Sequence, residues 1–239
     1  MNRATLAAIT AATIGTSSVN AATYTIDWLD MSPTAMGSSV PNGSVFNLPG
    51  AGAVTVTYSL APGFSDARTQ NPLFQNGSVT SGPDTWNWTS HELFGATNLT
   101  SSNPLVPLPW RITYSFTGTI PANRLYVGVA GLGQTTSFGG GATTATVNQN
   151  GTFVGDLISG GNYGATQFTS GPGFFSMQNS VNGAGGADPW WNTELGVVRI
   201  NDAVSSITVD FSQISGDGAC VNIGYAVPAT GSIPLLAAA

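Results

Sequence analysis

Apolar and polar side chains alternate along most of the chain, and this alternation predicts β-strands. The clearest case is residues 110–117 (WRITYSFT), in which every second residue is large and apolar. Successive side chains of a strand point to opposite faces, so one face of this segment is apolar and the other polar. The same pattern predicts further strands at residues 24–28, 54–60, 125–129, 143–147, 152–158, 207–211 and 221–225.

The stretch 205–225 (SSITVDFSQISGDGACVNIGY) contains two alternating segments around Gly216-Asp217-Gly218. Glycines beside an Asp favour a turn with positive φ, so the pattern predicts a closing hairpin with one face on the core and the other in solvent. Asn150-Gly151 predicts a second hairpin between 143–147 and 152–158. Residues 195–200 are apolar on both faces and predict a central, buried strand.

Glycine- and proline-rich segments separate these strands. Residues 30–49 and 160–186 are loop-like, and the irregular stretch 64–109 predicts either short strands or a long functional loop. After residue 22 no helical period longer than two turns is present, and nothing repeats at a fixed period. The fold class is therefore all-β: a single antiparallel β-sandwich with long Gly/Pro-rich loops, for which a jelly roll is one candidate topology.

Both ends differ in composition from this β-rich part. Residues 1–22 combine a short basic start, a mild apolar run and small residues before Ala21 and Ala22, which predicts an export signal. The expected organisation is a signal peptide at 1–22, a sandwich domain at 23–226 and a short apolar tail at 227–239. No apolar run is long enough to span a membrane.

The charge content is unusually low. Of 239 residues 7% are charged, and the formal net charge is −6. Nucleic acids and anionic membrane surfaces both demand basic patches, so this balance argues against either partner. Cys220 is the single cysteine and cannot form an internal disulfide. It is expected to be a small residue on the last strand.

Residue types that carry catalysis are scarce. His91 is the one histidine, and HELFG lacks the second His of a zinc helix. No GxSxG elbow or nucleotide-binding glycine fingerprint is present, so neither a catalytic residue nor an organic cofactor is assigned. Glu92 and Glu194 are the only glutamates, and both lie near tryptophans, which leaves a glycan hydrolase as one alternative.

Two sets of residues are candidate ligand sites. Trp86 and Trp88 are two residues apart, and Trp190 and Trp191 are adjacent in a glycine-rich segment. An exposed pair would stack on sugar rings, whereas the alternative is ordinary core packing. The loop and strand carboxylates of Asp210 and Asp217 are the candidate calcium ligands.

The C-terminal segment FSQISGDGACVNIGYAVPATGSIPLLAAA contains a predicted final strand, followed by Val227-Pro228 and then an apolar run. With the N-terminal signal and the low-charge composition, it resembles exported bacterial proteins of the PEP-CTERM type. It departs from them because Ala229-Thr230 replaces the usual Glu-Pro and no terminal Arg cluster follows.

The resemblance implies export and retention at the cell surface, often with exopolysaccharide, and it implies no enzyme activity. The leading expectation is therefore a non-enzymatic structural or adhesive protein of the cell surface or extracellular matrix. A carbohydrate-binding module and a glycan-active hydrolase are the two alternatives.

Overall fold

A computed structural model describes the chain in ten segments: residues 23–64, 66–69, 78–87, 93–95, 107–132, 134–135, 141–157, 166–179, 196–213 and 219–229. Within these segments the regular structure is β-strand throughout, with no helix. Two sheets pack face to face, which confirms the predicted all-β sandwich.

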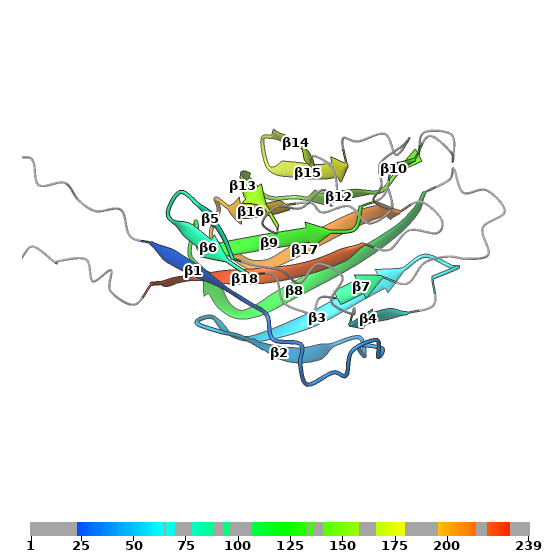
Figure 1. The fold of residues 1–239 in the computed structure, drawn as a ribbon. Helices are drawn as coiled ribbons and strands as arrows, with labels where there is room; N and C mark the ends of the chain where they lie inside the picture. Colours follow the sequence, from blue (N-terminus) through cyan, green and yellow to red (C-terminus); the bar gives the residue numbers. More distant parts are fainter. Residues whose placement is uncertain are drawn as a thin grey trace, which may run out of the picture.

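The first sheet has nine strands (Figure 1). Seven follow one path, in the order β13 (Gly151–Asp156), β16 (Gly196–Ile200), β9 (Leu125–Ala130), β18 (Cys220–Pro228), β1 (Tyr24–Trp28), β6 (Asp84–Trp86) and β5 (Val79–Ser81). β18 also pairs with β7 (Leu93–Gly95), which in turn pairs with β4 (Ala67–Thr69). All pairings in this sheet are antiparallel except that of β1 with β6.

The second sheet has seven antiparallel strands, in the order β14 (Thr166–Gly171), β15 (Phe174–Asn179), β12 (Thr144–Val147), β17 (Val204–Gln213), β8 (Leu108–Ile120), β3 (Gly52–Leu60) and β2 (Ser44–Leu48). β14 and β2 are its two edges, at the top and bottom of Figure 1. A separate two-stranded ribbon joins β10 (Gln134–Thr135) to β11 (Gly141–Ala142).

The central strands have the order of a jelly roll. Four strands of the nine-stranded sheet, β1-β18-β9-β16, pack on four of the seven-stranded sheet, β8-β17-β12-β15. Along the chain these strands alternate between the sheets, except for β12 and β15, which pair with each other. That alternation defines the double-sheet jelly roll, one of the candidate topologies from the sequence.

The main core lies between the two sheets and follows directly from the alternation. The apolar positions of 110–117 point inward, with Trp110, Ile112 and Tyr114 all buried. Their counterparts on β17 and β18, such as Val209 and Ile223, meet them from the neighbouring strand and the opposite sheet. Side chains of this size contribute about 1.5–3 kcal/mol each on burial, so this layer is the main source of stability.

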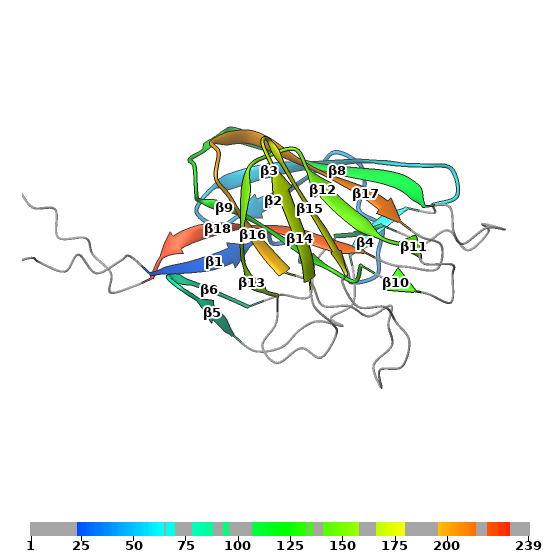
Figure 2. The same cartoon turned by 90° about the horizontal axis from the view of Figure 1, so that it is seen from above.

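A second core lies on the outer face of the nine-stranded sheet. Figure 2 shows β5 and β6 on the side of β1 and β18 that faces away from β3 and β8. The sheet curls there until β5 reaches β13, where the Ser81 hydroxyl donates to the Val154 carbonyl at 2.6 Å. The enclosed apolar residues are Ile26, Trp28, Trp86, Tyr126, Ala130, Leu157, Val197, Cys220 and Ala226.

The two predicted hairpins are wrong, although their strands exist. β17 lies in the seven-stranded sheet and β18 in the nine-stranded sheet, so the two strands do not pair with each other. The Asn150-Gly151 connection likewise carries the chain from β12 to β13 in the other sheet. Local alternation identifies the inward face of a strand, but it carries no information about which strand lies beside it.

The expected solvent face of the last strand is also wrong. Cys220, Asn222 and Gly224 are buried because the second core covers them, so β18 is central on both faces. The prediction for 195–200 is confirmed, since β16 lies between β13 and β9 and is largely buried.

Three boundaries differ from expectation. The predicted loop at 30–49 contains β2, and the predicted loop at 160–186 contains β14 and β15. The irregular region 64–109 contains short strands, which was one of its two expected forms. β18 continues to Pro228, two residues beyond the predicted domain end, because its backbone still pairs with β1 there. Residues 1–22 and 230–239 lie outside the described residues.

Candidate functional site

The outer face of the seven-stranded sheet carries a regular array of hydroxyl groups. Because the apolar residues of each strand point inward, the intervening Ser and Thr residues point outward, and the strand registers bring them into rows. One row runs Thr57, Thr113, Thr208, and the next runs Thr55, Ser115, Ser206. We call this array the hydroxyl face; it comprises Thr55, Thr57, Ser59, Thr113, Ser115, Thr144, Thr146, Thr169, Ser176, Ser206, Thr208 and Ser212.

Hydrogen bonds between strands fix part of this array. The hydroxyls of Thr113 and Thr208 lie 2.8 Å apart, and Thr146 donates to the Ser176 hydroxyl at 3.1 Å. Directly opposed Thr and Ser side chains of this kind stabilise a sheet by about 0.2–1 kcal/mol per pair. Each hydroxyl has one proton and two lone pairs, so these contacts leave acceptor capacity toward solvent.

One ion pair interrupts the hydroxyl face. Arg111 donates to both carboxylate oxygens of Asp210, from Nε at 2.5 Å and from a terminal nitrogen at 3.0 Å. The hydrogen bonds that Arg111 donates to Asp210, together with the negative charge of Asp210, raise the pKa of the Arg111 guanidinium. These two residues are the charged ones of the seven strands, and they neutralise each other. The face as a whole is therefore uncharged.

An open groove of about 490 Å³ lies at the end of this sheet where β3 ends and β8 begins. Its lining residues are Ser59, Leu60, Ala61, Pro109, Trp110, Arg111, Asp210 and Phe211. Trp110 and Phe211 stack with their centroids 4.1 Å apart and their rings nearly parallel, but both are 2% exposed. The Trp110 indole N–H donates to Gln213 at 2.6 Å. The stacked rings of Trp110 and Phe211 therefore form the floor of the groove and present no exposed ring face to a ligand.

A buried polar cluster lies within the second core. The Tyr126 hydroxyl donates to one carboxylate oxygen of Asp84 at 3.0 Å, and Arg199 lies 3.9 Å from the other. Burial raises the pKa of the Asp84 carboxyl, against the opposing effects of the Tyr126 hydrogen bond and the Arg199 charge. Burial also raises the pKa of the Tyr126 phenol. The cluster ties β6 to β9 and β16.

No family model, curated protein or solved structure matches the chain. Its function must therefore be inferred from its own residues.

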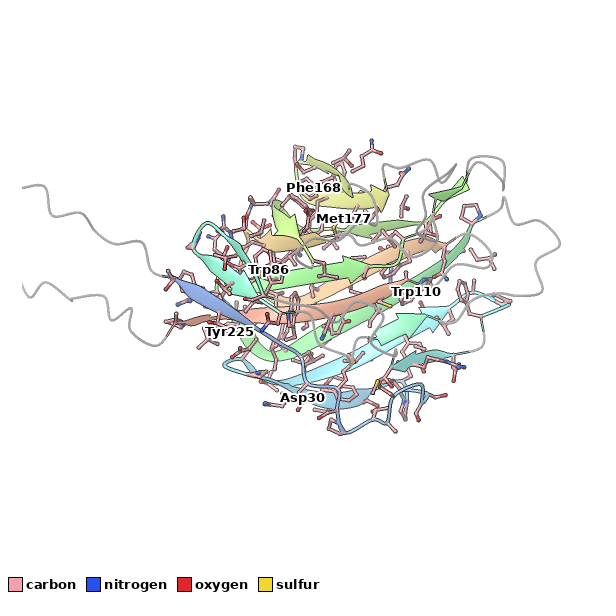
Figure 3. The ribbon with its side chains drawn as sticks, viewed as in Figure 1. Asp30, Trp86, Trp110, Phe168, Met177 and Tyr225 are labelled. Carbon is pink, nitrogen blue, oxygen red and sulfur yellow. The ribbon has the colours of Figure 1, made fainter. Side chains whose placement is uncertain are left out.

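The structure removes Trp86 from the candidate glycan-binding residues. Its side chain is 0% exposed and its indole N–H donates to the Leu157 carbonyl at 3.0 Å, so it is a core residue (Figure 3). The expectation that it presents a ring to sugar is corrected: β6 folds over the nine-stranded sheet and turns this ring inward. Trp88, Trp190 and Trp191 lie outside the described residues.

The proposed calcium ligands are not brought together in the described part of the chain. Asp210 is engaged by Arg111, and Asp217 lies outside that part, as do His91, Glu92 and Glu194. No cluster of three or more His, Cys, Asp or Glu side chains suited to a metal occurs among the described residues. The described residues also contain no helix long and apolar enough to cross a membrane.

The sequence showed the hydroxyl residues only as the polar half of alternating strands. Segments 55–59 and 113–115 contain Ser or Thr at every second position, and this is the signal that identifies the face. Their function as one surface depends on the pairing of β3, β8 and β17, which places the separate segments side by side.

Proposed function

We propose that the chain is an exported, non-enzymatic adhesive protein of the cell surface or extracellular matrix, which binds neutral polysaccharide through the hydroxyl face. The observation that carries this proposal is the charge-free array of Ser and Thr side chains over the seven-stranded sheet. The signal-like N-terminus and the low charge content of the chain support export and an extracellular role.

The chemistry of this face suits a neutral polymer of hydroxyl groups. A sugar hydroxyl and a Thr or Ser hydroxyl each donate and accept, so they pair directly or through water in several geometries. A polymer that covers the face does not bury an unpaired charge, because Arg111 and Asp210 remain paired with each other. Single hydrogen bonds contribute only about 0.5–1.5 kcal/mol net, so useful affinity requires many contacts along one polymer.

The test is co-sedimentation of the full chain with insoluble neutral polysaccharides, such as cellulose and mannan, and with the anionic polymer alginate for comparison. The proposal predicts binding to at least one neutral polymer and weaker binding to alginate. Thr57→Glu with Ser206→Glu places two charges on exposed positions of the face. Each charge buried without a partner costs more than the about 1–3 kcal/mol of an unsatisfied neutral group, so affinity is expected to fall at least about tenfold.

A control is Thr80→Glu, which adds one such negative charge to an exposed strand position on β5, outside the hydroxyl face. It is expected to bind as the unmodified chain does. Equal binding by the Thr57/Ser206 variant, or no binding to any neutral polysaccharide, would reject the hydroxyl face as the adhesive surface. Export is tested separately by sequencing the N-terminus of protein recovered outside the cell, where a retained Met1 would contradict it.

A further inference from the structure

β14 is an edge strand whose outer side has no backbone partner among the described residues. It pairs with β15 over all six of its residues, from Thr166 opposite Asn179 to Gly171 opposite Phe174. The described contacts of Phe168 and Ser170 lie on the β15 side or in the core. An unpaired edge presents a row of N–H and C=O groups that another strand can extend.

The register shows which backbone groups face outward. Pro172 and Gly173 form a two-residue turn, with Gly173 at φ 77°, so Gly171 and Phe174 form the hydrogen-bonded pair that closes it. Hydrogen-bonded and non-hydrogen-bonded pairs alternate along an antiparallel ladder. The N–H and C=O groups of Phe168 and Ser170 therefore point away from β15.

This edge is also held firmly in place. The Phe168 ring, labelled in Figure 3, lies on β14. It packs against Phe153 of the opposite sheet at 5.7 Å between centroids and against Phe175 at 5.8 Å. A strand anchored from below in this way keeps its outward groups in line. It therefore loses little conformational freedom when another strand adds to it.

Two other edges are partly occupied, whereas no described residue pairs with the outer side of β14. At β2, the Asp30 N–H already occupies the Asn47 carbonyl at 3.1 Å, and at β5 the Ser81 hydroxyl closes onto β13. β14 (TQFTSG) has no charged residue, no proline and no register shift, which are the usual devices that prevent edge pairing.

We propose that β14 pairs antiparallel with β14 of a second copy of this chain, joining two seven-stranded sheets into one. A two-fold axis at Phe168 places Ser170 of each strand opposite Thr166 of the other, so identical edges satisfy each other. The strand carries no charge, so two chains of net charge −6 meet without like charges at the contact. This self-association is independent of polysaccharide binding.

The test is analytical ultracentrifugation of the full chain over a wide concentration range. A single added strand is a small interface, so a reversible dimer with a micromolar or weaker Kd is expected. Ser170→Pro removes one outward N–H while the ladder to β15 keeps its bonds, and prolines are tolerated on edge strands. It is expected to weaken the dimer at least about tenfold. Ser170→Ala retains the N–H and is expected to dimerise as the unmodified chain does.

Hydrogen exchange at Phe168 and Ser170 gives a second measurement that needs no variant. These amides should exchange rapidly in dilute protein and become protected as its concentration rises. If Ser170→Pro fails to fold, this protection decides the question. A chain that stays monomeric with both amides unprotected, or a dimer that persists in a folded Ser170→Pro variant, would overturn the proposal.

Discussion

Trp86 provides the sharpest test of the second core. Its indole ring is fully buried between the β5–β6 hairpin and the rest of the nine-stranded sheet, and its N–H donates to the Leu157 carbonyl. Burying an indole removes about 150–250 Å² from water, or about 4–6 kcal/mol at 25 cal/mol per Å². Because surroundings relax partly, we expect Trp86→Ala to lower the free energy of unfolding by about 3–5 kcal/mol.

This loss is a large share of the total, since domains are commonly stable by about 5–15 kcal/mol. Trp86→Phe keeps much of the ring but removes the N–H donor, so about 1–3 kcal/mol is expected. Urea unfolding followed by circular dichroism measures both values. The comparison variant is Phe174→Ala, because Phe174 is 41% exposed and lies outside the second core, so its truncation should cost about 1–2 kcal/mol, clearly less than Trp86→Ala.

Cys220 reports on the same core without unfolding the protein. It is the single cysteine, it is 2% exposed, and it belongs to the cluster that Trp86 fills. A thiol reagent should label it slowly in the unmodified chain and in Phe174→Ala, and much faster in Trp86→Ala, because the cavity lowers the cost of local opening. If Trp86→Ala changes stability by less than about 1 kcal/mol and leaves labelling slow, the ring does not support this core.

Four further variants test individual interactions. Asp84→Asn removes a carboxyl whose pKa is raised by burial. The free energy of unfolding of the unmodified chain, relative to that of this variant, should therefore be greatest below pH 3.8 and fall as the pH rises. Urea midpoints that differ equally at all pH values would contradict this. Gly196→Ala places a Cβ 2.3 Å from Phe153 and 2.9 Å from a backbone oxygen, so thermal unfolding should show a loss of about 1–3 kcal/mol. Gly118→Ala meets nothing within 4 Å and should be neutral or stabilising by up to about 1 kcal/mol, and an equal loss in both variants would refute the packing argument. Asp210→Asn should leave the urea midpoint nearly unchanged, because exposed ion pairs contribute little, and added calcium should not shift the Tm of the unmodified chain; a calcium-induced rise abolished by this variant would show that Asp210 is a ligand.

The sequence was sufficient for the strands whose two faces differ most. In β8 the alternation of large apolar and small polar residues fixes both the strand and its inward face, since only one register buries the apolar set. β14 and β15 are harder to predict, because the apolar positions Phe168, Phe175 and Met177 alternate only over short segments around a Pro-Gly turn, and glycine-rich sequence flanks them.

Strand partners required the structure. A turn sequence such as Asn150-Gly151 favours reversal of the chain direction. The reversed chain can pair with the strand before the turn, or it can enter the opposite sheet, as β13 does after β12. In a jelly roll most neighbours along the chain lie in different sheets, so pairing is non-local and local signals cannot determine it. The hydroxyl face has the same limitation, because its rows arise from three strands far apart in sequence.

The composition of β18 explains why the two outer faces of the molecule differ. Its second face carries Cys220, Asn222, Gly224 and Ala226, small or polar residues that resemble a solvent face in sequence. A Cβ on Gly224 would lie 2.5 Å from Ile26. The residues on this face of β18 are therefore small because large side chains of neighbouring strands fill the space above them. The nine-stranded sheet thus uses its outer face for packing under β5 and β6. Among the described strands this leaves the hydroxyl face as the broad sheet surface available to a partner, which is why we propose it as the adhesive surface.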